Sequence, residues 1–202
     1  ALNCVACHER DGKGGPDAAR KPYFQGDHNL GDTGRYPPPL TGVGAVGVLI
    51  VLYLHGNGAT LERDVMVRQA VPRQVADTGQ NIALVAPQLA VDAADSSAGN
   101  FWRGGHFAKY LDEAAERLMR LEGNRQSGRS FNLAPVVIVA YSGGYLSTAY
   151  ALERGGANHR LKGVILMDAL YGDEDKFATW FAARRRQAFL LSAYTDSTKE
   201  EN

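Results

Sequence analysis

The sequence VVIVAYSGGY at residues 136–145 contains the feature that decides the fold. Its apolar first half is typical of a strand buried on both faces, and a helical pattern begins at Tyr145. Ser142 therefore lies in a tight turn at a helix N-terminus, where the helix dipole favours negative charge. Two interpretations stay open: the exposed nucleophile of a G-x-S-x-G turn, with Ala140 in the first glycine position, or an ordinary N-cap serine.

The same alternation of apolar runs and helical patterns recurs along residues 46–202. The expected strands cover residues 48–54, 82–86, 136–140, 164–167 and 189–193. The expected helices cover residues 61–78 (broken or bent at Pro72), 107–121, 145–152 and 175–185. Strands that alternate with helices form βαβ units, which require a parallel sheet. The sequence therefore predicts an α/β fold, with a parallel sheet of about five strands and helices on both faces.

The Ser142 turn and the sequence LHGNG at residues 54–58 together resemble the α/β-hydrolase family over residues 46–202. The resemblance implies that the first and third strands are neighbours and that their loops meet at the carboxyl edge of the sheet. It implies that Ser142 is the nucleophile and that the backbone N–H groups of Asn57 and Gly143 form an oxyanion hole. The side chain of His55 is expected to pack within its loop rather than to catalyse.

The family also implies an acid and a histidine that follow the serine in the chain. Asp196 is the first choice for the acid and Asp168 is the alternative, although either can be a solvated turn residue or a helix cap. His159 precedes a strand, so it is expected at the opposite edge of the sheet, and His106 is out of family order. The triad histidine is therefore expected to be missing from this chain, whose hydrolase-like part lacks the family's usual C-terminal segment.

The two cysteines, Cys4 and Cys7, precede His8 in a C-x-x-C-H pattern, which is typical of c-type haem attachment. A disulfide or two inert thiols are the alternatives. Residues 1–44 resemble the start of a bacterial cytochrome c domain, which implies covalent haem and assembly in the periplasm. The first methionine, Met66, lies in the next part of the chain, so residues 1–45 are interpreted as an incomplete cytochrome c-like arm rich in Gly and Pro.

The composition limits the classes of partner. The chain has 202 residues with 22 Lys and Arg against 22 Asp and Glu, and this balance argues against nucleic acid as the main partner. The longest apolar run, residues 43–54, is interrupted by glycine and is shorter than the roughly 20 residues that cross a bilayer. Because the chain begins with Ala and neither resemblance is complete, we interpret it as a processed product, a fusion or a fragment.

The patterns favour a serine hydrolase of carboxylesterase type that acts on a small-molecule ester and needs no cofactor in its core. The segment 92–105, with Phe101 and Trp102, is expected either to form a wall of the substrate pocket or to be an ordinary surface loop. The alternative function is a c-type haem electron-transfer module fused to a catalytically silent hydrolase-like domain. A scaffold with neither activity is the third interpretation.

Overall fold

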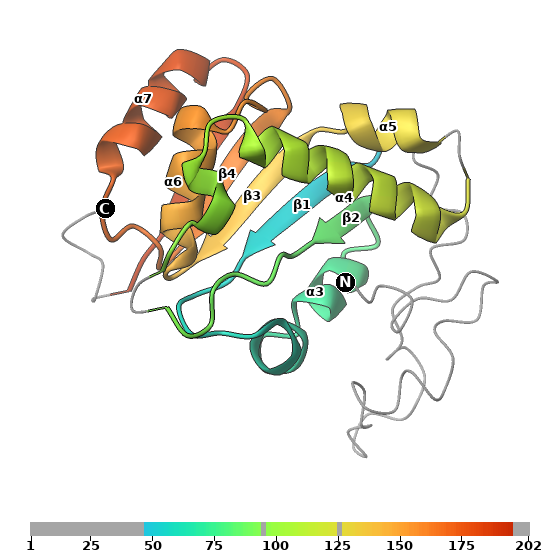
Figure 1. Cartoon of the computed structure of the whole chain (residues 1–202), viewed down its shortest axis with the longest axis horizontal. Helices are drawn as coiled ribbons and strands as arrows, with labels where there is room; N and C mark the ends of the chain where they lie inside the picture. Colours follow the sequence, from blue (N-terminus) through green and yellow to red (C-terminus); the bar gives the residue numbers. More distant parts are fainter. Residues whose placement is uncertain (1–46, 94–95, 125–126, 196–202) are drawn as a thin grey trace.

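A five-stranded parallel sheet organises the computed structural model, which describes residues 47–93, 96–124 and 127–195 (Figure 1). Its order is β2-β1-β3-β4-β5, so the first and third strands are neighbours and the second lies outside them. The strands are β1 (Leu49–Leu54), β2 (Ile82–Val85), β3 (Val136–Tyr141), β4 (Leu161–Met167) and β5 (Phe189–Ala193). The predicted α/β class and the parallel sheet are therefore confirmed.

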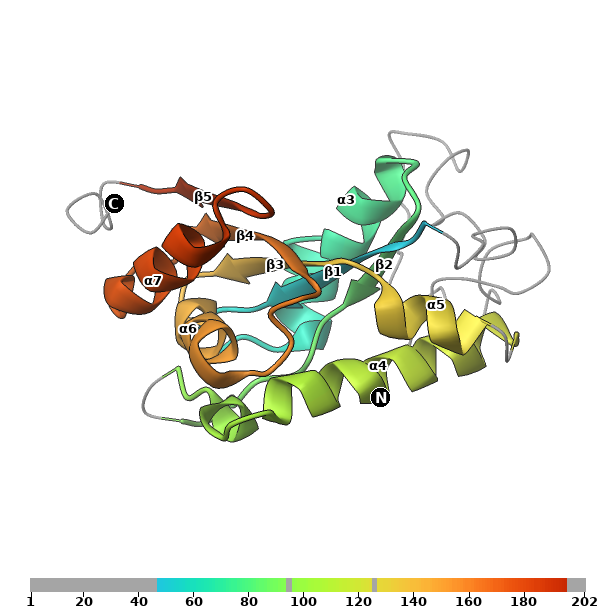
Figure 2. The same cartoon turned by 90° about the horizontal axis from the view of Figure 1, so that it is seen from above.

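Helical segments cover both faces of this sheet. They are the π-helix η1 (Leu61–Arg68), α3 (Val71–Asp77), the 3-10 turn η2 (Gly99–Trp102), α4 (His106–Glu122), α5 (Ser127–Leu133), α6 (Gly144–Arg154) and α7 (Glu174–Arg184). Figure 2 shows α4, α5 and α6 on one side of the sheet and α3 on the other. None of the described helices is both long and apolar enough to cross a membrane.

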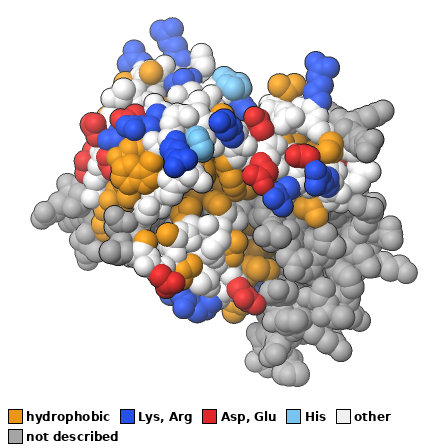
Figure 3. Space-filling view, in the orientation of Figure 1, with side chains coloured by type: hydrophobic (Ala, Val, Ile, Leu, Met, Phe, Trp, Pro, Cys, Tyr) orange, Lys and Arg blue, Asp and Glu red, His pale blue; other side chains and the backbone are white. Residues whose placement is uncertain are grey.

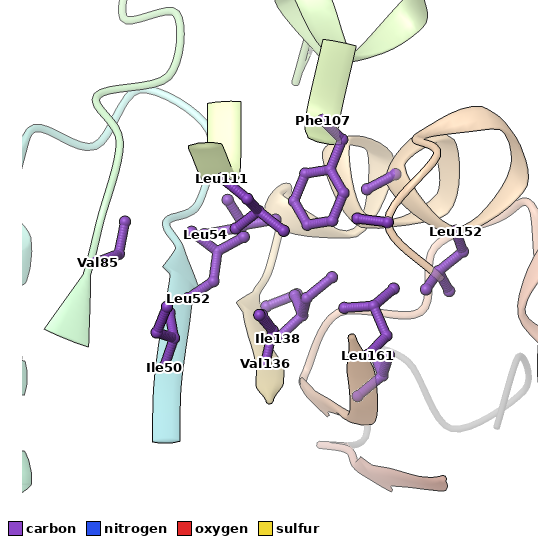
Figure 4. Close-up of a cluster of buried hydrophobic side chains, with 14 of the residues drawn as sticks. Ile50, Leu52, Leu54, Val85, Phe107, Leu111, Val136, Ile138, Leu152 and Leu161 are labelled. Carbon is purple, nitrogen blue, oxygen red and sulfur yellow. The ribbon is translucent and has the colours of Figure 1, made fainter. Parts of the chain in front are cut away.

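The core follows from the alternation of side chains along β1. Ile50, Leu52 and Leu54 are fully buried and face the layer that contains α4, where they join Phe107 and Leu111 (Figure 4). The intervening Tyr53 points to the other face and packs in a smaller cluster with Val65 of η1 and Ala86. Because successive strand residues point to opposite faces, a continuous apolar run is what a strand covered on both sides requires.

The strand register aligns the carboxyl ends of the central strands. Leu54 pairs with Ala140, and Tyr141 pairs with Met167. The loops after β1, β3 and β4 therefore begin at the same edge of the sheet, which is the edge where open α/β sheets bind their ligands.

The predicted helix over 61–78 is broken just before Pro72, which confirms one of the two expected outcomes. Ala70 adopts a left-handed conformation with φ of 50°, and Pro72 lies at the start of α3. Two elements differ from the sequence expectation. β4 begins at Leu161, three residues earlier than expected. Its first half was not predicted because the polar Lys162 and the small Gly163 interrupt the apolar pattern. Helix α5 was not predicted, and it packs against α4 through Phe131.

β5 forms one edge of the sheet and carries apolar side chains that are half exposed. Phe189 is 46% exposed and Leu191 is 50% exposed. Such an edge favours association between molecules. Over the face shown in Figure 3, basic and acidic side chains are interspersed, as the balanced composition implies.

Candidate active site

Ser142 occupies the turn between β3 and α6 in a strained backbone conformation. Its φ is 49°, which is the left-handed region that L-residues other than glycine rarely adopt. Hydrogen bonds fix the turn on both sides, from Ser142 N–H to the carbonyl of Met167 (3.2 Å) and from Tyr145 N–H to the carbonyl of Ser142 (3.2 Å). This conformation costs about 1–2 kcal/mol, and such strain concentrates at functional sites.

Two glycines allow the chain segments around Ser142 to approach one another. A Cβ at Gly144 would overlap the carbonyl oxygen of Leu54 and would lie 3.2 Å from that of His55. A Cβ at Gly56 would lie 3.1 Å from the Cβ of Ser142. The loop after β1 therefore packs directly against the serine, and the glycines are needed for this close approach.

The backbone N–H groups of Asn57 and Gly143 lie close together beside this serine. A Cβ at Gly143 would lie only 2.9 Å from the nitrogen of Asn57. Within the described part of the chain, neither N–H donates a hydrogen bond. Asn57 is exposed and Gly143 is buried, and two N–H groups that are open beside a serine hydroxyl are suited to bind an anionic or carbonyl oxygen of a ligand.

His55 is buried and holds the loop that carries Asn57. Its side chain accepts at Nε2 from the N–H of Leu89 (2.9 Å) and from the amide of Gln88 (2.9 Å). Because both neighbours are donors, Nε2 is unprotonated, and Nδ1–H donates to the carbonyl of Gly56 (2.8 Å). The ring is therefore neutral and fully used within the loop, as expected for a packing histidine.

Gln88, which follows β2, connects the loop after β1 to the start of η1. Its Nε2 also donates to the carbonyl of Ala59 (3.1 Å), and its Oε1 accepts from the N–H of Leu61 (2.8 Å). Sequence reasoning did not single out Gln88. The available signal was the first polar residue after an apolar strand, which places it near the ligand-binding edge of the sheet.

Asp64 of η1 anchors the end of the loop that leads from β1 into η1. Its carboxylate is buried and accepts from the N–H of Thr60 (2.8 Å) and from Arg63 Nε (3.0 Å). Arg63 also donates to the carbonyl of Gly58 (3.0 Å), and Arg68 forms an ion pair with Asp64 (3.1 Å). The hydrogen bond from Arg63, followed by that from Thr60, holds the pKa of the Asp64 carboxyl below its usual value.

The lowered pKa of Asp64 gives a prediction for acid stability. A carboxyl with a lowered folded-state pKa stabilises the protein above its unfolded pKa of about 3.9, and this contribution is lost as the pH falls through the folded-state pKa. Asp64→Asn is expected to reduce stability at pH 7 and to flatten the loss of stability below about pH 4. Urea unfolding between pH 7 and pH 2 measures both effects. The control is Asp77→Asn, because Asp77 is exposed. If stability falls equally steeply below about pH 4 in both variants, the prediction is wrong.

Asp168, the alternative acid, follows β4 at the same edge as Ser142. Its φ is also 49°, and its N–H donates to the carbonyl of Ala193 (2.7 Å). Its Oδ1 accepts from the N–H (3.0 Å) and the hydroxyl (2.7 Å) of Thr195. The structure therefore brings Asp168 to the expected edge, and Asp196 lies outside the described residues.

The described histidines other than His55 lie away from Ser142. His159 precedes β4 and is exposed at the amino ends of the strands, as expected. His106 begins α4 next to the C-terminus of α6, where Gly105 N–H donates to the carbonyl of Arg154 (2.9 Å). Because α6 has 11 residues and rises about 1.5 Å per residue, His106 is roughly 15 Å from the Ser142 turn. No described histidine is placed to accept the proton of Ser142.

The aromatic residues of segment 92–105 pack against the neighbouring helices. Phe101 is only 7% exposed and packs edge-on against Phe107 and Tyr110 of α4. Trp102 stacks on Tyr150 of α6, with ring centroids 4.2 Å apart. The rings therefore anchor the segment to the helices, as the surface-loop interpretation expects, and the pocket-wall role stays a prediction. Ser96, in the same segment, does reach the Ser142 turn.

Cys4, Cys7 and His8 lie outside the described residues, so haem attachment there stays a prediction. In the described ranges, no group of three or more His, Cys, Asp and Glu side chains is arranged to hold a metal ion. Compared with protein-family models, with curated proteins and with solved structures, the chain has no significant match. The assignment of function therefore depends on the geometry around Ser142.

Proposed function

We propose that the protein is a serine hydrolase of carboxylesterase type with an α/β-hydrolase-like core. The observation that carries the proposal is the strained Ser142 beside two neighbouring backbone N–H groups, Asn57 and Gly143, that have no acceptor among the described residues. A plain N-cap serine would require neither the left-handed φ nor the neighbouring pair of free donors.

In the proposed reaction, Ser142 Oγ attacks the carbonyl carbon of a small-molecule ester and forms a new C–O bond. The carbonyl oxygen becomes negatively charged and accepts from the N–H groups of Asn57 and Gly143. The alcohol then leaves with the proton that the serine released, and water hydrolyses the acyl group from Ser142. Each donor of this kind is typically worth about 100-fold to 1000-fold in rate.

The proton of Ser142 needs a base, and we assign this role to a histidine that does not belong to this chain segment. Asp196, or Asp168 at the same edge of the sheet, would orient that histidine. An oxyanion hole still accelerates acyl transfer about 1000-fold over water when a triad member is absent. Activated esters and phosphonates, whose leaving groups need little protonation, are therefore the appropriate probes.

A fluorophosphonate probe tests the proposal directly on the whole chain. We expect one adduct per molecule, located on Ser142 by mass spectrometry, and faster labelling when imidazole is added as a substitute base. Ser192→Ala, which removes a serine from the edge strand β5, is the control and is expected to label like the wild type. A folded protein without an adduct on Ser142 would contradict the proposal.

The packing of His55 predicts that its side chain supports the rate without touching the substrate. His55→Leu removes the acceptor of Leu89 N–H and the donor to Gly56, so the loop that carries Asn57 loses its fixed position. We expect acylation by p-nitrophenyl acetate to fall about 100-fold, as when one oxyanion donor is lost. The control His159→Leu makes the same change on the surface and is expected to leave the acylation rate unchanged. An unchanged rate in folded His55→Leu protein would contradict this role.

A further inference from the structure

We propose that the side-chain hydroxyl of Ser96 is a third donor of the oxyanion hole, an inference that rests on the proposed function. A Cβ at Gly143 would overlap Ser96 Oγ and would lie 2.8 Å from Ser96 Cβ. The same point is 2.9 Å from the nitrogen of Asn57. The hydroxyl of Ser96 and the backbone of Asn57 therefore converge on one spot beside Gly143.

The hydroxyl of Ser96 is available for a ligand. Within the described ranges it makes no hydrogen bond, whereas the adjacent Ser97 accepts from the N–H of Gly99 (3.3 Å) and is used locally. The segment that carries Ser96 is held in place, because Ala98 is 2% exposed and Phe101 is 7% exposed in the core. Its hydroxyl is thus presented from a segment anchored in the core.

Three neighbouring donors without a partner among the described residues have a simple chemical consequence. Asn57 N–H and Gly143 N–H can only donate, and Ser96 accepts from neither of them, so its own proton is free to point at a shared acceptor. An oxygen that gains negative charge as Ser142 attacks satisfies all three donors at once. This arrangement also accounts for glycine at position 143, because any larger residue would displace Ser96.

Ser96→Ala tests the inference, with Ser97→Ala as the matched control. We expect the rates of fluorophosphonate labelling and of acylation by p-nitrophenyl acetate to fall about 100-fold, with little change in KM. Ser96→Thr retains the hydroxyl and is expected to retain most of the rate. Ser97→Ala removes only a local hydrogen bond to Gly99 and is expected to label like the wild type.

The possible failures are distinguishable. An unchanged rate in Ser96→Ala, with Ser142 still labelled, would overturn the third donor alone. A faster rate in Ser96→Ala would also overturn it, because the hydroxyl would then obstruct the hole. The absence of a Ser142 adduct in the wild-type protein would overturn both the proposed function and this inference. Thermal unfolding of each variant establishes that the comparison is made between folded proteins.

Discussion

Replacing Ser142 with glycine is expected to abolish acylation and, at the same time, to stabilise the fold. The loss of the nucleophile should abolish acylation by p-nitrophenyl acetate, because no hydroxyl remains at position 142 to accept the acyl group. The residue has a φ of 49°, which costs an L-residue about 1–2 kcal/mol and costs glycine nothing. Glycine also makes the unfolded chain more flexible, which offsets part of this gain, so we expect the free energy of unfolding to rise by about 0.5–1 kcal/mol.

Ser147→Gly is the control for this change. Ser147 lies in the interior of α6, where glycine is expected to cost about 1 kcal/mol. Urea unfolding measures the free energy of unfolding of both variants, which is expected to rise in Ser142→Gly and to fall in Ser147→Gly. The reaction with p-nitrophenyl acetate measures acylation. If Ser142→Gly destabilises the protein as much as Ser147→Gly does, then the turn stores no strain and the main support for a functional serine is lost.

The parts of the fold that could be predicted are those encoded by local patterns. Continuous apolar runs indicated all five strands, because the central strands are covered on both faces and so contain few polar residues. The Ser142 turn could be predicted because glycine, serine and small residues mark it directly. The adjacency of β1 and β3 came from the family resemblance, and the sheet order confirms it.

The parts that could not be predicted depend on contacts between distant segments. α5 has a mostly polar sequence, SGRSFNL, and its helix is stabilised by packing of Phe131 against α4 rather than by a periodic apolar face. Ser96 has no local signal at all, since its position is defined only by the approach of its segment to Gly143. Gln88 reaches His55 across 33 positions of sequence, and its role is visible only in three dimensions.

The backbone strain at this edge involves two neighbouring strands. Ser142 after β3 and Asp168 after β4 both have a φ of 49°, and the N–H of Ser142 donates to the residue just before Asp168. Strained residues persist where the surrounding structure fixes them, and here the bonds to Met167 and Ala193 do so. Two such residues at adjacent strand ends favour a functional edge over an isolated irregular turn.

Replacing Gly144 with alanine is expected to cause the largest loss of stability. In a helix, glycine to alanine normally gains about 1 kcal/mol, so helix propensity alone predicts a more stable protein. Here the new Cβ would overlap the carbonyl oxygen of Leu54, which is fixed in the central strand β1. Forcing an extra atom into a packed interior costs about 1–3 kcal/mol, and more when backbone must move, so we expect a net loss of about 2 kcal/mol or more.

The same substitution should also impair the candidate site, because α6 and the loop after β1 are forced apart. This separation would pull the N–H of Gly143 away from that of Asn57, and we expect labelling of Ser142 to slow at least tenfold even at temperatures where the variant is folded. Gly104→Ala is the control, since Gly104 is exposed and a Cβ there would meet nothing within 4 Å. If Gly144→Ala were as stable as Gly104→Ala, the close approach of α6 to β1 would be wrong, and with it the geometry that places Ser142 beside its two donors.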